Sequence, residues 1–150
     1  MELDNFILKE YNEKNIEHSS IIDTLDLDEK SKNFIGRTRT LIQIINKRKE
    51  DEDYLHNNTY IAYYNDRPVG YISLTHKEDN YEIISGLLKE ERNQHLGALL
   101  LLEFSEKVFE KYKDIDKLTL KINSKNLGSI KCAELVGYKH ENKDIYTMKR

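Results

Sequence analysis

The chain has 150 residues, which suits a single domain over 1–150. With 38% hydrophobic and 34% charged residues, it has enough apolar side chains for a core and enough charge for a solvated surface. A net charge of -3 without a basic cluster argues against a nucleic-acid partner, because phosphate recognition needs grouped Lys and Arg. The single cysteine rules out an internal disulfide. No secretion signal or membrane-length apolar run is visible, so we expect a cytoplasmic protein.

The N-terminal part of the sequence predicts one strand and two helices. Segment 6–11 alternates enough to be a short strand, and a helix over 12–25, capped near Asn12, follows it. The acidic segment 23–30 is predicted to be a loop. Apolar residues then recur at helical spacing, which predicts an amphipathic helix over 31 to about 49.

The next region predicts strands. Residues 59–76 are expected to form a hairpin around the turn residues 65–68, which contain Asn-Asp and the only proline. A third strand is predicted over 80–90. Gly86 lies inside this strand, and a glycine there marks either a bulge or a close approach to the backbone.

The second half alternates helices and strands. A helix over 97–113, a strand over 116–123, a helix between an N-cap at Asn126 and Gly137, and a last strand over 143–150 are predicted. A strand-helix-strand unit favours parallel pairing with the helix crossing over. We therefore expect an α/β fold, with a mixed sheet of antiparallel early strands and parallel later strands, flanked by about four helices.

The segment from Arg92 to Gly97 is a candidate anion site, because it joins a predicted strand to a predicted helix. The first turn of a helix has backbone N–H groups without intrahelical partners, and the helix dipole is positive there. A diphosphate suits such a place, Arg92 adds charge, and Gly97 allows close approach. The alternative is an ordinary solvated loop in which Gly97 permits a tight turn. The pattern alone leaves both open.

This segment resembles motif A of the GNAT acetyltransferases, Arg/Gln-x-x-Gly-x-Gly/Ala between a strand and a helix. Arg92 takes its first place and Gly97 its last, while His95 stands where the family prefers glycine. A histidine that adopts a positive φ there does so at some cost. The family's motif B is matched by Asn126, Ser129, Gly137 and Tyr138. The resemblance covers about residues 59–138.

The resemblance implies the GNAT fold, with acetyl-CoA bound where the central parallel strands separate. The pantetheine arm would pair with the strand backbone beside Gly86, and the pyrophosphate would lie on N–H groups at the start of the next helix. The implied cofactor-binding residues are Leu87, Leu88, Arg92, Asn93, Gln94, His95, Leu96, Gly97, Ala98, Asn123, Asn126 and Ser129. We expect no metal, because the histidines and the single cysteine lack ligand spacing.

Acetyl transfer to an amine needs a base, because a lysine-like amine has a pKa of about 10.4. Glu82, acting through a water, is the candidate. Its place ten positions before Arg92 (92 − 82 = 10) resembles the ribosomal-protein N-terminal acetyltransferase branch. The alternative is a solvent-facing strand residue. Ala133 stands where many members carry a tyrosine acid, so we predict no tyrosine acid in that helix, and we predict a structural role for Cys132.

The implied function is an acetyl-CoA-dependent N-acetyltransferase. It would move an acetyl group to a primary amine, on a small molecule or a protein N-terminus, by direct transfer in a ternary complex. Four acids within 23–29 would attract a cationic acceptor, or they simply favour the start of the next helix. A non-catalytic acyl-CoA-binding sensor and a cofactor-free interaction module stay open. We expect no nucleic-acid or membrane partner, and pairing of two copies through a sheet edge is left open.

Overall fold

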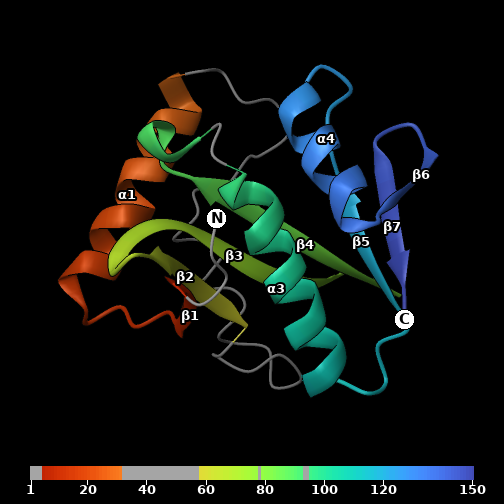
Figure 1. Cartoon of the computed structure of the whole chain (residues 1–150), viewed down its shortest axis with the longest axis horizontal. Coiled ribbons are helices and arrows are strands. Elements are labelled where there is room, and N and C mark those ends of the chain that lie inside the picture. Colours follow the sequence, from red (N-terminus) through yellow and green to blue (C-terminus); the bar gives the residue numbers. More distant parts are fainter. Residues whose placement is uncertain (1–4, 32–57, 78, 93–94) are drawn as a thin grey trace.

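The computed structural model of the protein describes residues 5–31, 58–77, 79–92 and 95–150 (Figure 1). The predicted helix over 31–49 lies outside them, except for Ser31, which ends α1. The described elements are β1 (Phe6–Glu10), α1 (Ile16–Ser31), β2 (Thr59–Tyr64), β3 (Arg67–Lys77), β4 (Asn80–Leu87), the 3-10 turn η2 (Lys89–Glu91), α3 (Leu96–Lys111), β5 (Lys117–Lys121), α4 (Leu127–Val136), β6 (Lys139–Asn142) and β7 (Ile145–Lys149).

The described strands form one sheet in the order β1-β2-β3-β4-β5-β7-β6. All neighbours are antiparallel except β4 and β5, which run parallel. The predicted mixed α/β sheet is therefore confirmed. Parallel pairing of the last strand is wrong, because β7 lies antiparallel between β5 and β6. β6 is missing from the predicted elements, since its four exposed residues carry no apolar alternation.

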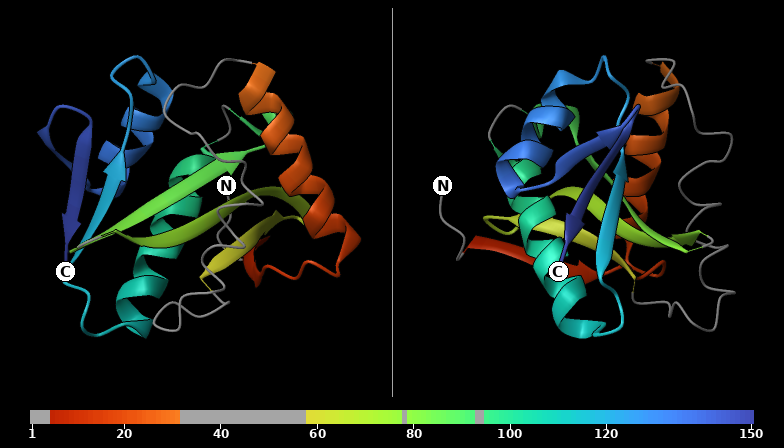
Figure 2. Two further views of the ribbon diagram at one scale, coloured as in Figure 1. Left: turned by 180° about the vertical axis from the view of Figure 1, so that it is seen from behind. Right: turned by 90° about the vertical axis from the view of Figure 1, so that its right-hand side faces the viewer.

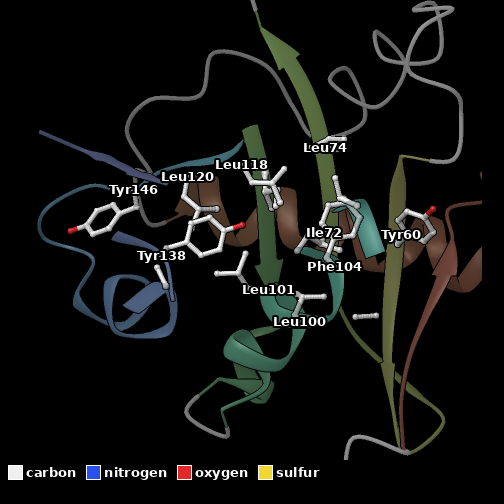
Figure 3. Packing of buried hydrophobic residues seen from close by; sticks show 14 of the residues in the cluster. Tyr60, Ile72, Leu74, Leu100, Leu101, Phe104, Leu118, Leu120, Tyr138 and Tyr146 are labelled. Atoms are coloured by element: carbon white, nitrogen blue, oxygen red, sulfur yellow. The ribbon is translucent and has the colours of Figure 1, made fainter. Parts of the chain in front are cut away.

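Helices cover both faces of the sheet. α3 and α4 lie on one face and α1 on the other, as the views in Figure 2 show. On the α3 face, apolar residues of the central strands and both helices form the larger core cluster (Figure 3). Its members Ile72, Phe104 and Leu118 are at most 1% exposed. The smaller cluster lies under α1 and includes Ile22 and Tyr71.

Helix α1 starts and ends later than predicted. Asn15 caps it, since its Oδ1 accepts hydrogen bonds from the N–H groups of Glu17 (2.9 Å) and His18 (3.3 Å). The helix then continues through 23–30, so the predicted acidic loop is wrong. No proline or glycine interrupts this segment, and burial of Leu25 prolongs the apolar stripe of the helix.

The β2–β3 hairpin turns on Asn65 and Asp66, whose φ values are 52° and 63°. Both residue types tolerate the left-handed region, and two such residues suit the type I′ turn that matches strand twist. Pro68 belongs to β3 rather than to the turn, and it lies opposite Tyr63, where the β2–β3 register shifts. A proline fits an irregular pair because it has no N–H for the ladder. The hairpin prediction is confirmed, with a shorter turn.

Gly86 is a place where a side chain packs closely against the strand backbone, and it is not a bulge. β4 pairs with β3 in an unbroken register over its whole length. A Cβ at Gly86 would lie only 3.0 Å from Cε1 of Tyr71, whose ring is buried on the α1 side. The glycine therefore makes room for a ring of the smaller core cluster.

Candidate functional site

The centre of the sheet separates between β4 and β5. A single pair of residues, Glu82 and Thr119, joins these two parallel strands. Beyond that pair, β4 continues to Leu87 and β5 to Lys121 without pairing with each other. Figure 1 shows the two strands diverging toward their carboxyl ends, with the start of α3 at the same end. The separation therefore lies beside the predicted anion site.

At the end of β4, some backbone N–H and C=O groups are hydrogen-bonded within the protein and others face the separation. Leu88 donates its N–H to the Val69 C=O (2.9 Å), and its own C=O accepts the N–H of Glu91 (2.9 Å). In an antiparallel ladder, residues opposite each other alternate between bonded and non-bonded pairs. Leu87, opposite Gly70, therefore turns its N–H and C=O away from β3 and toward the β5 side. Of the two predicted leucines, Leu87 has the backbone groups that face the separation.

Helix α3 is preceded by a residue in the left-handed backbone conformation, at the place where the family prefers glycine. His95 precedes the helix with φ 62° and ψ 9°, in the left-handed region, and its exposed side chain makes no cap hydrogen bond. Its C=O accepts the N–H of Leu99 (3.2 Å). Leu96 and Gly97 precede that bond, so their N–H groups lie in the first turn, where no intrahelical acceptor is available. The start of α3 thus presents donors and the positive end of the helix dipole.

Three elements meet at Gly97. A Cβ there would lie 3.2 Å from Sγ of Cys132 in α4 and 3.7 Å from Cδ1 of Leu87 in β4. Burial raises the pKa of the Cys132 thiol, and a hydrogen bond from the backbone of Ala98 opposes that shift. The glycine allows α4 to pack closely against the first turn of α3. The Cys132 thiol is half-buried in this contact, and its structural role stays a prediction.

Arg92 lies at the approach to this helix start. It follows the η2 turn as its cap, is partly buried, and donates its N–H to the Lys89 C=O (3.4 Å). Asn93 and Gln94, the two predicted amide donors, lie outside the described residues. A folded turn, rather than an extended loop, therefore connects β4 to Arg92.

Motif B builds the turn between β5 and α4. Asn126 caps α4, with its Oδ1 accepting the N–H of Ser129 (3.2 Å). Asn123 Oδ1 accepts the N–H of Lys125 (2.9 Å), and the Asn123 C=O accepts the N–H of Asn126 (2.9 Å). Gly137 ends the helix with φ 112°. Both predicted caps are confirmed, and both asparagine oxygens have a structural task, while a cofactor contact of either side chain stays a prediction.

Tyr138, which follows the C-terminal end of α4, is buried. The Tyr138 hydroxyl hydrogen-bonds Ser105 of α3 (2.7 Å), and burial raises the pKa of the phenol. Ala133, at the place of the family's tyrosine acid, is fully buried. No tyrosine occurs within α4. The helix therefore packs against α3 and offers no phenol acid of its own.

Glu82 lies where β4 and β5 begin to separate. Ile83 packs into the cluster on the α3 side and Ile84 against the cluster on the α1 side, so strand alternation places Glu82 on the α1 side. Its neighbours on β3 and β5 are Thr75 and Thr119. The carboxylate side chain is partly buried and not fully solvent-facing. This position suits a base, and the role stays a prediction.

One ion pair at the site has no counterpart among the predicted residues. Arg67, at the start of β3, donates Nε to both carboxylate oxygens of Glu91 (2.9 and 3.1 Å) and Nη2 to one of them (3.0 Å). Glu91 is 6% exposed, and hydrogen bonding to it raises the pKa of the Arg67 guanidinium. The partners are 24 positions apart, so no local pattern indicates their pairing.

Metal-binding clusters and membrane-spanning helices are absent from the part of the chain that the structure describes. Among the described residues, no group of three or more His, Cys, Asp or Glu side chains is arranged to hold a metal ion. In the part of the molecule that the structure describes, no helix has both the length and the apolar character needed to cross a membrane.

Comparison with known proteins gives a family match. Residues 22–138 match the model of the acetyltransferase (GNAT) family, a span of 117 residues (138 − 22 + 1) that includes both motifs. A search of curated proteins finds no match.

Solved structures of similar fold cover nearly the whole sequence. A GNAT-family acetyltransferase from Bacillus anthracis is 12% identical with a TM-score of 0.74, over 97% of this chain and 95% of that one. The aminoglycoside acetyltransferase AAC(6')-Ib, in complex with coenzyme A and kanamycin, is 17% identical with a TM-score of 0.68, over 97% and 95%. The Campylobacter jejuni N-acetyltransferase PseH, in complex with acetyl coenzyme A, is 17% identical with a TM-score of 0.65, over 97% and 99%. At such low identity, the TM-scores and coverages show a shared fold and nothing more.

Proposed function

We propose that the chain, which belongs to the GNAT acetyltransferase family, moves an acetyl group from acetyl-CoA to a primary amine by direct transfer in a ternary complex. The observation that carries the proposal is the separation of β4 from β5 beside the start of α3. An extended arm suits an open strand edge, and a diphosphate suits a helix start. Two similar structures were solved with coenzyme A or acetyl-CoA.

We expect the two ends of the cofactor to use different groups. The pantetheine arm would pair with Leu87, because both backbone groups of Leu88 are already bonded within the protein. The pyrophosphate would accept hydrogen bonds from the N–H groups of Leu96 and Gly97, with Arg92 adding charge. The other residues that we propose to contact the cofactor are Asn93, Gln94, His95, Ala98, Asn123, Asn126 and Ser129.

The chemistry requires a proton acceptor and stabilisation of charge. The bound thioester supplies the acetyl group. Glu82 would take the proton of the attacking amine through a water as the N–C bond forms and the C–S bond breaks. Backbone N–H groups of β4 that face the separation would stabilise negative charge on the carbonyl oxygen. The thiolate would leave without a tyrosine acid and take its proton from water. Cys132 has no part, because its thiol packs against the first turn of α3.

We propose a small-molecule amine with net positive charge as the acceptor, with a protein N-terminus as the alternative. The similar structure of AAC(6')-Ib is a complex with kanamycin, which supports a small-molecule acceptor. The acids of 23–29 lie on α1, where Asp23 is exposed, and negative charge there would attract a cation.

A non-catalytic acyl-CoA-binding protein of the same fold is the second candidate. Two observations favour it. His95 holds a left-handed backbone conformation where the family prefers glycine, and Ala133 occupies the place of the tyrosine acid. This candidate predicts cofactor binding without turnover.

Calorimetry with coenzyme A, and thiol release from acetyl-CoA with a panel of amines, test the proposal. We expect binding, and turnover on cationic primary amines. Glu82→Gln should lower kcat/KM by about 10²–10⁴-fold, the usual contribution of a general base, and leave the Kd for coenzyme A unchanged. Glu106→Gln, at an exposed position of α3, is the matched control and should change neither.

Each alternative has its own result. Turnover confined to neutral amines would overturn the cationic acceptor. Binding without turnover on any amine, with Glu82→Gln indistinguishable from the wild type, would favour the sensor. If coenzyme A gives no heat at high protein concentration, both cofactor-dependent candidates are wrong.

A further inference from the structure

The ion pair between Arg67 and Glu91 lies directly before Arg92, the residue proposed to add charge at the diphosphate site. Arg67 begins β3, and Glu91 ends η2 immediately before Arg92. The guanidinium engages the carboxylate through two nitrogens, Nε to Oε2 at 2.9 Å and Nη2 to Oε1 at 3.0 Å. The Glu91 side chain is 8% exposed and that of Arg67 is 44% exposed. A buried negative charge next to Arg92 is thus neutralised from the hairpin side.

Backbone hydrogen bonds hold the same junction. Leu88 donates to the C=O of Val69 in β3, and the N–H of Glu91 returns to the C=O of Leu88. The turn between β4 and Arg92 is therefore attached to the start of β3 twice, once through the backbone and once through the ion pair. A change in either attachment would move the residue that follows, which is Arg92.

We propose that Arg67 is a positioning residue for the diphosphate group of the cofactor, acting by neutralising Glu91 and fixing the turn that presents Arg92. This inference rests on the proposed function. Without Arg67, the Glu91 carboxylate would be a buried, unpaired charge, which the turn would relieve by rearranging toward water. The same carboxylate would repel a diphosphate nearby and compete with it for Arg92. Both effects weaken binding of the phosphate end and leave the thioester end untouched.

Calorimetry with coenzyme A on four full-length proteins tests the proposal: wild type, Arg67→Gln, Arg67→Lys, and the double variant Arg67→Gln/Glu91→Gln. Arg67→Gln should raise the Kd about tenfold, a scale set by one charge-assisted contact, and Arg67→Lys should raise it less. The double variant should return the Kd to within about threefold of wild type, because no carboxylate remains to repel the diphosphate. Lys113→Gln removes one exposed positive charge elsewhere and should leave the Kd unchanged.

A truncated donor separates positioning from general damage. S-acetylpantetheine lacks the diphosphate and nucleotide, so kcat/KM with this donor should be the same for Arg67→Gln and wild type, whereas kcat/KM with acetyl-CoA should fall. An unchanged Kd for coenzyme A in Arg67→Gln would overturn the inference. So would an equal loss with both donors, or a double variant that binds as weakly as the single one. If no amine is acetylated, the proposed function fails, and the Kd series still decides the role of Arg67.

Discussion

At the scale of single residues, His95 is where this protein departs most visibly from its family. The family's glycine can adopt a positive φ without cost, whereas a side chain in the left-handed region is strained. The sequence identifies the departure, but it does not say whether the glycine serves conformation or space. In this protein, His95 has a φ of 62° and an exposed ring, so the demand on this residue is the left-handed conformation and not a lack of space. The protein therefore holds backbone strain at the start of the helix proposed to bind the diphosphate.

We expect His95→Gly to stabilise the protein. Relief of left-handed strain gains about 1–2 kcal/mol, and the added freedom of glycine in the unfolded state takes back about 0.4–1 kcal/mol. The free energy of unfolding, measured by urea denaturation, should thus rise by about 0.5–1 kcal/mol. His95→Ala removes the same ring but keeps the strained φ, so it should give no gain. Equal stabilisation by both variants would mean that the ring, and not the backbone, is the cause.

At the scale of elements, the helix ends differ in how far the sequence predicts them. Both ends of α4 are predicted correctly, because a cap is a local device. Asn126 accepts an N–H of the first turn, and Gly137 adopts the left-handed conformation that ends the helix. The C-terminal end of α3 is different. Arg150 donates to the C=O groups of Phe109 (2.7 Å) and Tyr112 (2.6 Å), and a partner that distant in sequence has no pattern to indicate it.

The hydrogen bond between Ser105 and Tyr138 joins α3 to the end of α4 inside the core. Ser105 is 1% exposed and Tyr138 2%, and their hydroxyls are 2.7 Å apart. A buried hydroxyl that loses its partner costs about 1–3 kcal/mol. This bond therefore gives Tyr138 a structural reason for its place in motif B that is independent of any role with the cofactor.

The losses in stability from removing the Ser105 and Tyr138 hydroxyls should not be additive. Ser105→Ala leaves the buried Tyr138 hydroxyl without its partner, so the free energy of unfolding should fall by about 1–3 kcal/mol. Tyr138→Phe should cost less, because the Ser105 hydroxyl can turn to a backbone C=O within its own helix. The double variant should be more stable than the sum of the single losses predicts. Chemical denaturation of the four proteins measures this coupling, and strict additivity would contradict it.

At the scale of the whole molecule, stability should depend on pH through one buried histidine. His18 is 3% exposed, and its Nδ1 accepts the N–H of Asn12 (3.0 Å), which requires a neutral ring with its proton on Nε2. Burial lowers the pKa of His18; Glu17 opposes this shift and Lys9 adds to it. A histidine in the unfolded state binds a proton near pH 6.5. The unfolded state therefore takes up this proton at a higher pH than the folded state does.

The free energy of unfolding should fall as the pH drops below about 6.5. The loss should continue until the folded state also binds the proton. His18→Asn keeps an acceptor near the place of Nδ1 but cannot be charged, so the dependence on pH between about 7.5 and 5.5, on either side of the unfolded pKa, should become weaker. His140→Asn, at an exposed position of β6, is the control and should keep the wild-type dependence. Urea denaturation at each pH gives the measurement. An unchanged slope in His18→Asn would assign the effect to other groups.

The mixed sheet could be predicted from the sequence, and the candidate site could be proposed from it, because both rest on local patterns. Alternation indicates most strands, Asn65 and Asp66 indicate the hairpin turn, and motif A indicates the helix start. The extension of α1 could not be predicted in the same way, because it depends on Leu25 joining the buried cluster that also contains Tyr71 of a distant strand. The antiparallel last strand depends on a short β6 without an apolar pattern.

The same division holds within the site. The residue types suited to a diphosphate stand next to one another in the sequence, so the site could be proposed from them. The sequence could not show which backbone groups are available to a cofactor, because Leu88 is bonded to Val69, a residue of another strand. The pairing of Arg67 with Glu91 likewise depends on how the hairpin folds back onto the η2 turn. The residue types of the candidate site can therefore be read from neighbouring positions, whereas their hydrogen bonds and ion pairs depend on residues distant in the sequence.

A consequence follows from the single pair that joins β4 to β5. The described sheet consists of two halves. One contains β1, β2, β3 and β4, the other contains β5, β7 and β6, and a single residue pair joins the two backbones. Their union depends on apolar side chains of both halves, such as Ile83 and Leu118, that share one cluster with α3. Loosening that cluster should let each half open as its own cooperative unit. A cofactor bound as proposed, in contact with both halves, should therefore stabilise their union in the same way as the shared apolar cluster does.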